Sequence, residues 1–505
     1  MTGVQTCALP ICFPDRFQLE LQLHRQSVHS IFSDLFAGKT RVEEGIAANI
    51  HRFVNHNMND AQVREWLTAM GFEDAPKSLH ILCLLRDAPA FGHSPSKMRN
   101  LLANVLTSVM ENAAKLVRPD AVITGLERLI ESVGSREAFF TSLLGNPRSI
   151  SRIVRVLALS DYLSDILFST PEVLDFLIDD DRLERPIRRP VQTSDRKIQE
   201  FYAGVQHLLG IVPRRRSTRL LTRFAEREVR KHIAANGPVA IFALGKFGER
   251  ELNFRSDLDI VAVYQGAHTP ALDAVEHLIA ELSPHFKLDL RLRPDGKKGS
   301  LIFNLERYRE YLADRAETWE RMAFTRARFI AGNPALAAAT QSLIDEFVYG
   351  RPFGENQAEE MKRIRYRMEF EIGREKEDAF DVKVGHGGFV DIEFLSQIEQ
   401  MRRNIRIPNT VAVLKRLNNS AALIEYYEFL REVEMMLRLW SSVASTRFQT
   451  PDREALGIMV GVKDFAGEFN RVRNEVRKVW QRYELPLSDR APTTRTRRPE
   501  SKPDS

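Results

Sequence analysis

The sequence contains little cysteine. Cys7, Cys12 and Cys83 are the three cysteines in a chain of 505 residues. They do not form the two matched pairs of a zinc site, and an odd, sparse set fits a reducing compartment better than a disulfide framework. We therefore expect a cytoplasmic protein.

Long apolar runs and a strong excess of one charge are also missing. Because no uninterrupted apolar stretch reaches about 18 residues, we expect no transmembrane helix and no membrane partner. The 73 basic and 68 acidic residues leave a net charge of +5, which gives little support to a nucleic-acid partner. With 43% hydrophobic and 28% charged residues, the composition is that of a globular protein, and the length suggests about three domains.

The first twelve residues differ from the rest. The string MTGVQTCALPI (residues 1–11) resembles a translated sequencing adapter. A signal peptide is disfavoured because no Lys or Arg precedes Arg16 and the apolar stretch is short. We expect residues 1–12 to lie outside the fold, and the natural protein to begin further upstream.

Helical patterns dominate both flanks of the chain. Residues 13–210 show apolar side chains at helical spacing, as in 121–131 and 150–157, with helix starts at Ser94-Pro95, Ser135 and Thr170-Pro171. Residues 355–485 are again helical apart from a glycine-rich loop at 383–388, and residues 486–505 have the composition of a disordered tail.

A different pattern occupies the centre, residues 211–345. Short apolar or alternating runs at 239–244, 257–264 and 287–293 predict strands, and residues 271–282 and two segments within 304–330 predict helices. The fold class expected is therefore mostly α, with a central α/β domain flanked by helical domains.

Paired aspartates carry the chemical signal. Gly245 and Gly248 follow the first strand, where a glycine turn lets backbone amides approach a phosphate. Asp257 and Asp259 should project from one face of the second strand, and Asp289 from the polar face of the third. Neighbouring carboxylates repel each other unless a cation such as Mg²⁺ lies between them. A third carboxylate could complete a two-metal site or accept a proton. The alternative is a solvated strand face.

The strand, glycine turn and Asp-hydrophobic-Asp arrangement resembles the DNA polymerase β-like nucleotidyltransferase superfamily. Four longer segments resemble glutamine synthetase adenylyltransferases in the same order: GKFGERELNFRSDLDI (245–260), RLRPDGKKGSL (291–301), TWERMAFTRARFIAG (318–332, expected as one helix) and KVGHGGFVDIEFLSQ (383–397). The resemblance implies a polymerase β-like mixed sheet in the central domain.

The resemblance also implies roles for individual residues. Asp257, Asp259 and Asp289 would be catalytic and bind Mg²⁺. The remaining residues would bind ATP, and they are Gly245, Lys246, Gly248, Ser256, Arg291, Arg293, Lys383, Gly387 and Gly388.

Other charged residues leave two interpretations open. Asp391 and Glu393 fit a structural ion pair as well as a catalytic role. The cations Arg291 and Arg293 could serve only to pair with Asp257 and Asp259. Two larger groups have structural alternatives: a buried salt-bridge network for Glu320, Arg326 and Arg328, and a solvated face for Arg214, Arg215 and Arg216.

The chain also departs from the family pattern. Ala243 and Glu249 stand where the family usually has glycine, and His386 where it has proline. The segment 264–287 is short. These departures spare the metal carboxylates but bear on substrate handling.

The resemblance implies AMP transfer from ATP to a tyrosine of glutamine synthetase, with release of pyrophosphate and a PII-type signal protein as regulator. The segment preceding the catalytic domain resembles the linker of the family's adenylylating C-terminal half. The alternatives are the phosphorolytic, de-adenylylating half, uridylyl transfer to a PII protein, and a non-catalytic adaptor that senses nucleotide. A nucleic-acid polymerase fits the balanced charge least.

Overall fold

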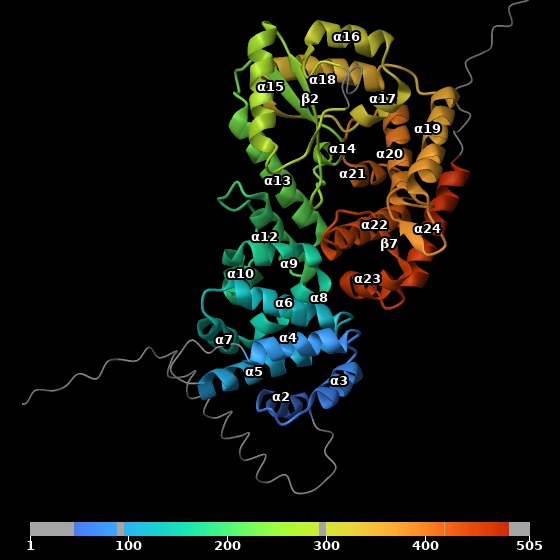
Figure 1. Cartoon of the computed structure of the whole chain (residues 1–505). Coiled ribbons are helices and arrows are strands. Elements are labelled where there is room, and N and C mark those ends of the chain that lie inside the picture. Colours follow the sequence, from blue (N-terminus) through green and yellow to red (C-terminus); the bar gives the residue numbers. More distant parts are fainter. Residues whose placement is uncertain (1–44, 88–94, 292–298, 419, 484–505) are drawn as a thin grey trace, which may run out of the picture. The chain divides into compact units, whose positions relative to one another are not determined.

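The computed structural model describes residues 45–87, 95–291, 299–418 and 420–483 (Figure 1). Expectations about residues 1–12, Arg293 and the tail at 486–505 lie outside these ranges. The chain divides into two compact units, Met1–Arg185 and Pro186–Ser505. Within the described residues, no helix is long and apolar enough to span a bilayer.

The first unit is helical throughout its described part. Its α-helices are α2 (Ile46–Val54), α3 (Asp60–Ala69), α4 (Ala75–Asp87), α5 (Pro95–Ala113), α6 (Pro119–Ser132), α7 (Arg136–Gly145), α8 (Pro147–Leu159), α9 (Asp161–Ser169), α10 (Leu174–Ile178) and α11 (Asp180–Glu184). The apolar stripes predicted at 121–131 and 150–157 are buried in α6 and α8. Ser135 caps α7 as expected, but Thr170 makes no side-chain cap and precedes a 3-10 turn at Pro171–Val173.

The second unit opens with α12 (Arg196–Leu208) and α13 (Arg214–His232), which lead into a mixed sheet. The sheet order is β3 (Leu288–Asp289), β2 (Leu258–Tyr264), β1 (Val239–Ala243) and β5 (Arg328–Gly332), and β4 (Phe303–Asn304) also pairs with β2. Strands β1 and β2 are antiparallel, whereas β2 and β3 are parallel.

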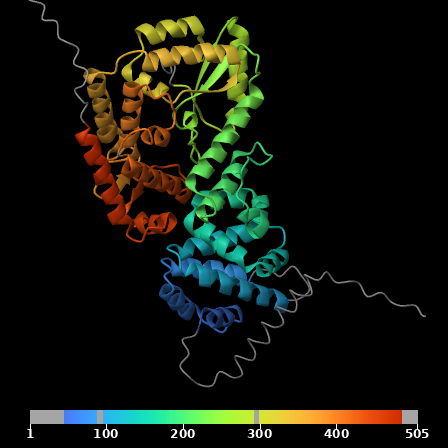
Figure 2. The same ribbon diagram turned by 180° about the vertical axis from the view of Figure 1, so that it is seen from behind.

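Helices enclose this sheet (Figure 2). Helix α13 packs against α15 (His268–Leu282) and β5, while α18 (Pro334–Tyr349) packs against β1 and β2. Every residue of β1 is buried, so both faces of the sheet are covered there, and its continuous apolar run is the sequence signature of that burial. Two more helices, α16 (Leu305–Asp314) and α17 (Thr318–Phe324), complete the domain.

Two predicted elements were wrong in this domain. Residues 318–332 do not form one helix, because the chain turns after α17 and Arg328–Gly332 pairs with β1 as β5. Gly332 adopts φ +105°, and a Cβ there would lie 2.2 Å from the Val239 carbonyl oxygen, so the strand end requires glycine. Of the strand expected at 287–293, the described residues 287–291 form a strand only at Leu288–Asp289. The backbone N–H of Arg291 donates to Asp289 Oδ1 at 2.9 Å and bends the chain away.

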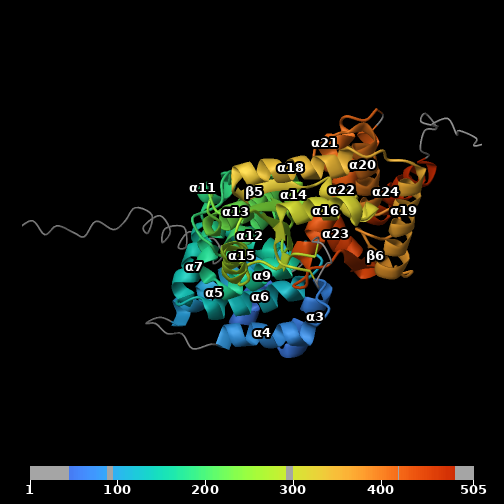
Figure 3. The same ribbon diagram turned by 90° about the horizontal axis from the view of Figure 1, so that it is seen from above.

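The C-terminal part of this unit is a helical bundle. Its α-helices are α19 (Glu355–Arg367), α20 (Phe389–Arg403), α21 (Thr410–Leu414), α22 (Ala421–Trp440), α23 (Arg453–Val460) and α24 (Phe465–Arg482). Helix α20 contacts both α22 and α24 (Figure 3). A small antiparallel sheet, β6 (Ala379–Asp381) with β7 (Arg447–Gln449), was not predicted. Phe380 and Phe448 stack across it at 5.4 Å between ring centroids.

Candidate functional site

Three aspartates meet where β2 and β3 run side by side. Asp259 in β2 is in direct register with Asp289 in β3. Cross-strand neighbours in register project from the same face of a sheet, so these two carboxylates lie together. Asp257 lies immediately before β2 and not within it, so its position depends on the loop as well as on the strand.

The charges around Asp259 show which groups converge. Burial, with the nearby carboxylates of Asp289 and Asp257, raises the pKa of Asp259 to about 6, although Lys383 and Arg291 oppose the shift. Asp259 therefore lies near two other carboxylates and two cations. The structure thus brings five of the predicted site residues together, and Lys383 comes from the C-terminal bundle.

The other two carboxylates are already paired. Lys287 Nζ donates to Asp257 Oδ2 at 2.7 Å. Arg291 Nε donates to both oxygens of Asp289, at 2.9 and 2.8 Å, and these hydrogen bonds hold the pKa of Asp289 below its usual value. Among the described residues, no three His, Cys, Asp or Glu side chains form a ready cluster for one metal ion.

The glycine turn abuts the aspartates directly. Gly245 adopts φ +52°, and a Cβ there would lie 2.2 Å from Asp259 Oδ2. The next contact is through the backbone, where the Leu244 N–H donates to the Asp259 carbonyl at 2.9 Å. Glycine is therefore required at 245 both by its left-handed conformation and by the neighbouring carboxylate. At Gly248 the close neighbour is instead the Arg326 carbonyl oxygen, which would lie 2.0 Å from a Cβ, so that glycine serves packing.

Ser256 shapes the loop before Asp257. Its hydroxyl oxygen accepts a hydrogen bond from the Asn253 N–H at 3.1 Å, and its own N–H donates to the Asn253 carbonyl at 3.2 Å. Arg196 donates to the Ser256 carbonyl at 3.1 Å. These bonds fix the turn that delivers Asp257 to the site.

Lys246 lies in a buried network that links the glycine turn to the bundle. Its ammonium donates to Glu249 at 2.8 Å and to the Tyr427 hydroxyl at 3.0 Å, and it forms an ion pair with Glu393. Burial, together with the nearby Arg431, lowers the pKa of Lys246 despite these carboxylates. The phosphate-binding role predicted for Lys246 would require its ammonium to leave one of these partners.

Glu249 is the second member of this network. Its carboxylate, 3% exposed as a residue, accepts from the Thr410 N–H at 3.1 Å and pairs with Arg326 at 3.3 Å. Arg326 also pairs with Glu393 at 3.2 Å. Sequence reasoning missed this role and noted Glu249 only as a departure. Its place three residues after Lys246 on the same helical turn was the available signal.

The glycine-rich loop at the start of α20 adds Lys383 to the site but holds its glycines elsewhere. Gly387 adopts φ +62° and packs against the backbone of Arg473 in α24. Gly388 is the N-cap of α20 and lies against the Lys383 carbonyl. Backbone conformation or close packing explains why glycine stands at both positions. Their assignment to nucleotide binding stays a prediction.

The structure shows ion pairs for Asp391 and Glu393 of α20. Asp391 is fully buried and pairs with Arg365, and burial raises the pKa of Asp391 to about 6 against the effect of that arginine. The carboxylate of Glu393 belongs to the network with Lys246, Arg326 and Tyr427.

The two larger groups of charged residues noted in the sequence also differ in their burial and their partners. A salt-bridge network of Glu320, Arg326 and Arg328 was one expectation. Glu320 instead accepts a hydrogen bond from the Tyr311 hydroxyl, and Arg328 pairs with Glu226 at 2.7 Å. Only Arg326 belongs to the network at Lys246. A solvated face was the wrong expectation for Arg214, which is 3% exposed and pairs with Glu251 at 2.8 Å, although Arg216 is exposed.

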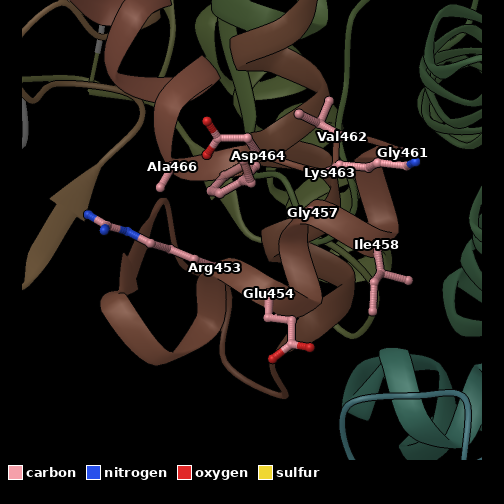
Figure 4. Close-up of a pocket in the computed structure, with 10 residues that line it drawn as sticks. Arg453, Glu454, Gly457, Ile458, Gly461, Val462, Lys463, Asp464 and Ala466 are labelled. Carbon is pink, nitrogen blue, oxygen red and sulfur yellow. The ribbon is translucent and has the colours of Figure 1, made fainter.

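A separate cavity of about 600 Å³ lies between α23 and α24 (Figure 4). Arg453, Glu454 and Asp464 are among its lining residues. None of the predicted site residues lines it, so it is distinct from the aspartate site.

Sequence comparisons divide the second unit into the same two parts, the sheet domain and the helical bundle. Residues 196–343, which hold the sheet and the aspartates, match the family described as Glutamate-ammonia ligase adenylyltransferase. Residues 362–483, which hold the bundle, match the family described as GlnD PII-uridylyltransferase. Both matched families are described as enzymes that transfer a nucleotide, an adenylyl group in one and a uridylyl group in the other.

Individual relatives extend the similarity over most of the chain. The bifunctional glutamine synthetase adenylyltransferase/adenylyl-removing enzyme of Xanthomonas campestris pv. campestris (strain ATCC 33913) is 28% identical over 463 residues, which cover 79% of this chain and 49% of the relative. The enzyme of the same name from Nitrosomonas eutropha is 25% identical, covering 91% of this chain and 55% of the relative. The chain is homologous to these bifunctional enzymes and spans about half of their length.

Proposed function

We propose that this chain is an adenylyltransferase that moves AMP from ATP to a tyrosine of glutamine synthetase and releases pyrophosphate. The observation that carries the proposal is the contact of Gly245 with Asp259, which lies in register with Asp289. A nucleotide phosphate reaching the glycine turn would lie beside the carboxylates. Residues 211–345 would be the nucleotidyltransferase domain, with the polymerase β-like sheet.

The aspartates fit a magnesium site by their charge. Burial and the carboxylates of Asp289 and Asp257 together raise the pKa of Asp259, while Lys383 and Arg291 oppose the shift. Asp257, Asp259 and Asp289 would hold Mg²⁺, which prefers carboxylate oxygens and, when bound, would supply charge neutralisation for the ATP phosphates. Lys287 and Arg291 would give up part of their pairing with Asp257 and Asp289 as ATP enters.

The residues around the aspartates would orient the reactants. Arg291 and Lys383 would contact phosphate oxygens, for which a planar guanidinium is well suited. The low pKa of Asp289 keeps it ionised at neutral pH, so it could accept the proton of a tyrosine hydroxyl, whose own pKa is near about 10. Arg293, Gly387 and Gly388 keep the nucleotide-binding roles that the family resemblance gives them. The protein would act in the cytoplasm under a PII-type regulator.

Labelled nucleotides test the proposal. The chain is incubated with Mg²⁺, glutamine synthetase and ATP labelled at the α-phosphate, and the tyrosines are examined for label. We expect labelled tyrosine from the native chain and a loss above about 100-fold in Asp257→Asn, since each 1.4 kcal/mol of lost stabilisation is about tenfold in rate. Near-native labelling by Asp257→Asn would reject the site.

The relatives' names also include adenylyl removal, so a second arm offers adenylylated glutamine synthetase and inorganic phosphate. Release of ADP there, without labelling in the first arm, would assign the chain to the de-adenylylating direction. A third arm with UTP and a PII protein tests uridylyl transfer, since the bundle resembles that family. No reaction in any arm, with ATP still bound, would favour the nucleotide-sensing adaptor.

A further inference from the structure

A second cavity of the Pro186–Ser505 unit, of about 520 Å³, lies between α13, α21 and the segment that follows the glycine turn. Four arginines line it: Arg215, Arg219 and Arg223 of α13, and Arg250. This volume suits a small molecule and not a macromolecule. The proposed reaction uses none of these arginines, and the family resemblance gives none of them a role, although Arg250 stands within the matching segment 245–260.

The acidic residues of the cavity are neutralised from outside it. Glu226 pairs with Arg328 at 2.7 Å, and Glu251 with Arg214 at 2.8 Å. The third carboxylate, that of Glu249, belongs to the network with Lys246 and Arg326. None of these cationic partners lines the cavity. The cavity therefore keeps an excess of positive charge although it contains three glutamates.

The arginines differ in how fully they are engaged. Arg215 pairs with Glu428 at 2.9 Å, and Arg223 donates one N–H to the Arg188 carbonyl at 3.0 Å. Arg250 is 64% exposed and lies 3.9 Å from Glu226, so its pairing is loose. Arg219 is exposed, and no ion pair within the described part of the chain includes it. Three guanidinium groups thus retain N–H donors for a ligand.

The spacing of these groups indicates the chemistry of the ligand. Arg219 and Arg223 are four residues apart, so they form a short row on one face of α13, about 6 Å along the helix axis, and Arg250 lines the same cavity. Such a row matches a chain of linked phosphates better than a single anion, because each planar guanidinium binds phosphate oxygens in pairs.

We propose that this cavity binds a small anion with linked phosphate groups, at a site separate from the aspartates. Arg250 and Glu251 lie in the segment that joins the glycine turn to Asp257. The Leu252 N–H in this segment donates to the Thr222 hydroxyl, which also lines the cavity. A ligand on Arg219, Arg223 and Arg250 therefore constrains the loop that positions Asp257, which makes the cavity a regulatory site.

Calorimetric titration of the full chain with sodium tripolyphosphate tests this site. The titration is done in EDTA, where the unneutralised aspartates repel anions. We expect saturable one-to-one binding that weakens at least about tenfold in Arg219→Ala/Arg223→Ala, since two charge-assisted contacts are lost. Arg250→Ala should weaken it independently. Arg216→Ala is the matched control, because Arg216 is exposed on the same helix, carries the same charge and does not line the cavity.

One further variant locates the binding site. Asp259→Asn should leave the titration unchanged, because the carboxylate lies outside the cavity. The proposal fails if the native chain shows no saturable binding, if Arg216→Ala weakens it as much as the double variant, or if only Asp259→Asn alters it. Since the arginines changed are at the surface, thermal melts of the variants should match the native chain, and the same titration remains interpretable for each one.

Discussion

At the scale of single residues, Asp259 is the group whose protonation depends most on its neighbours in the site. It is largely enclosed, touches the glycine turn, and is flanked by Asp289 and Asp257. The ionised form of such an enclosed carboxylate lowers the stability of the fold, which favours a functional use for its negative charge.

The raised pKa of Asp259 gives a stability prediction with a defined pH window. A raised folded-state pKa means that the folded protein favours the protonated form, so this contribution is present below the unfolded value of 3.8 and is lost as the pH rises through about 6. Asp259→Asn, which cannot ionise, should therefore be more stable than the native chain above pH 6, by about 1–2 kcal/mol once partial solvent screening is allowed for. Below pH 4 the two should be alike.

Thermal melts in EDTA between pH 4 and pH 7.5 measure this difference. Asp175→Asn, a change at an exposed aspartate of α10, is the control and should show no such window. A gap between Asp259→Asn and the native chain that does not vary with pH would contradict the assignment.

Gly245 gives a second prediction at this scale. Alanine there would meet Asp259 Oδ2 as well as the strain of φ +52°. We expect Gly245→Ala to lose transfer activity and to cost more stability than the roughly 1 kcal/mol of left-handed strain alone. Gly266→Ala is the matched control, because Gly266 has φ +92° with nothing within 4 Å of a Cβ. Equal melting temperatures and activities for the two variants would show that the contact with Asp259 is unimportant.

At the scale of elements, the sequence predicted those whose signal is local. The apolar stripes of α6 and α8 and the buried run of β1 needed no knowledge of partners. Strand β5 was missed because RFIAG continues a helical pattern, and only pairing with β1 makes it a strand. The β6–β7 sheet joins segments far apart in the sequence, so each three-residue strand carries too little pattern to be read alone.

The same distinction separates the site residues. The Asp-X-Asp and alternating patterns predicted that Asp259 and Asp289 lie on strands, whereas their register comes from the structure. The pairing of Lys246 with Glu393 and Tyr427 could not, because it depends on how the bundle packs against the sheet domain. The pairing of Lys287 with Asp257 was also missed, because it joins the residues that precede two different strands and depends on how those strands pair.

The network of Lys246, Glu249, Glu393, Arg326 and Tyr427 gives a prediction for the glycine turn of α14 (Gly245–Gly248). Glu249→Gln removes one of two carboxylates from a buried cluster of cations, and breaking such a pairing typically costs about 3–5 kcal/mol. We expect a destabilisation of about 2–4 kcal/mol, since glutamine keeps some hydrogen bonds.

Urea denaturation of native chain and variant measures this cost. Glu306→Gln provides the comparison, because Glu306 pairs with Arg309 at the surface of α16, where ion pairs contribute about 0–1 kcal/mol. If both substitutions cost the same, the buried network does not stabilise the turn.

At the scale of the whole molecule, every described residue of the candidate site belongs to the Pro186–Ser505 unit. That unit has its own buried sheet and bundle core. We therefore predict that residues 186–483 alone fold cooperatively, with a single thermal transition by circular dichroism, and keep Mg²⁺-dependent ATP binding by calorimetry. Broad, non-cooperative melting of this fragment would show that the Met1–Arg185 unit is needed for the fold of the site.

The ion pair between Lys246 and Glu393 joins positions 147 residues apart. A ribosome adds about 5–20 residues per second, so roughly 7–30 seconds separate the synthesis of the two partners. During that interval the sheet domain has emerged without the carboxylate and the tyrosine that enclose its lysine. A growing chain thus cannot complete this network until Glu393 and Tyr427 of the bundle have been made, which delays the maturation of the site by at least that interval.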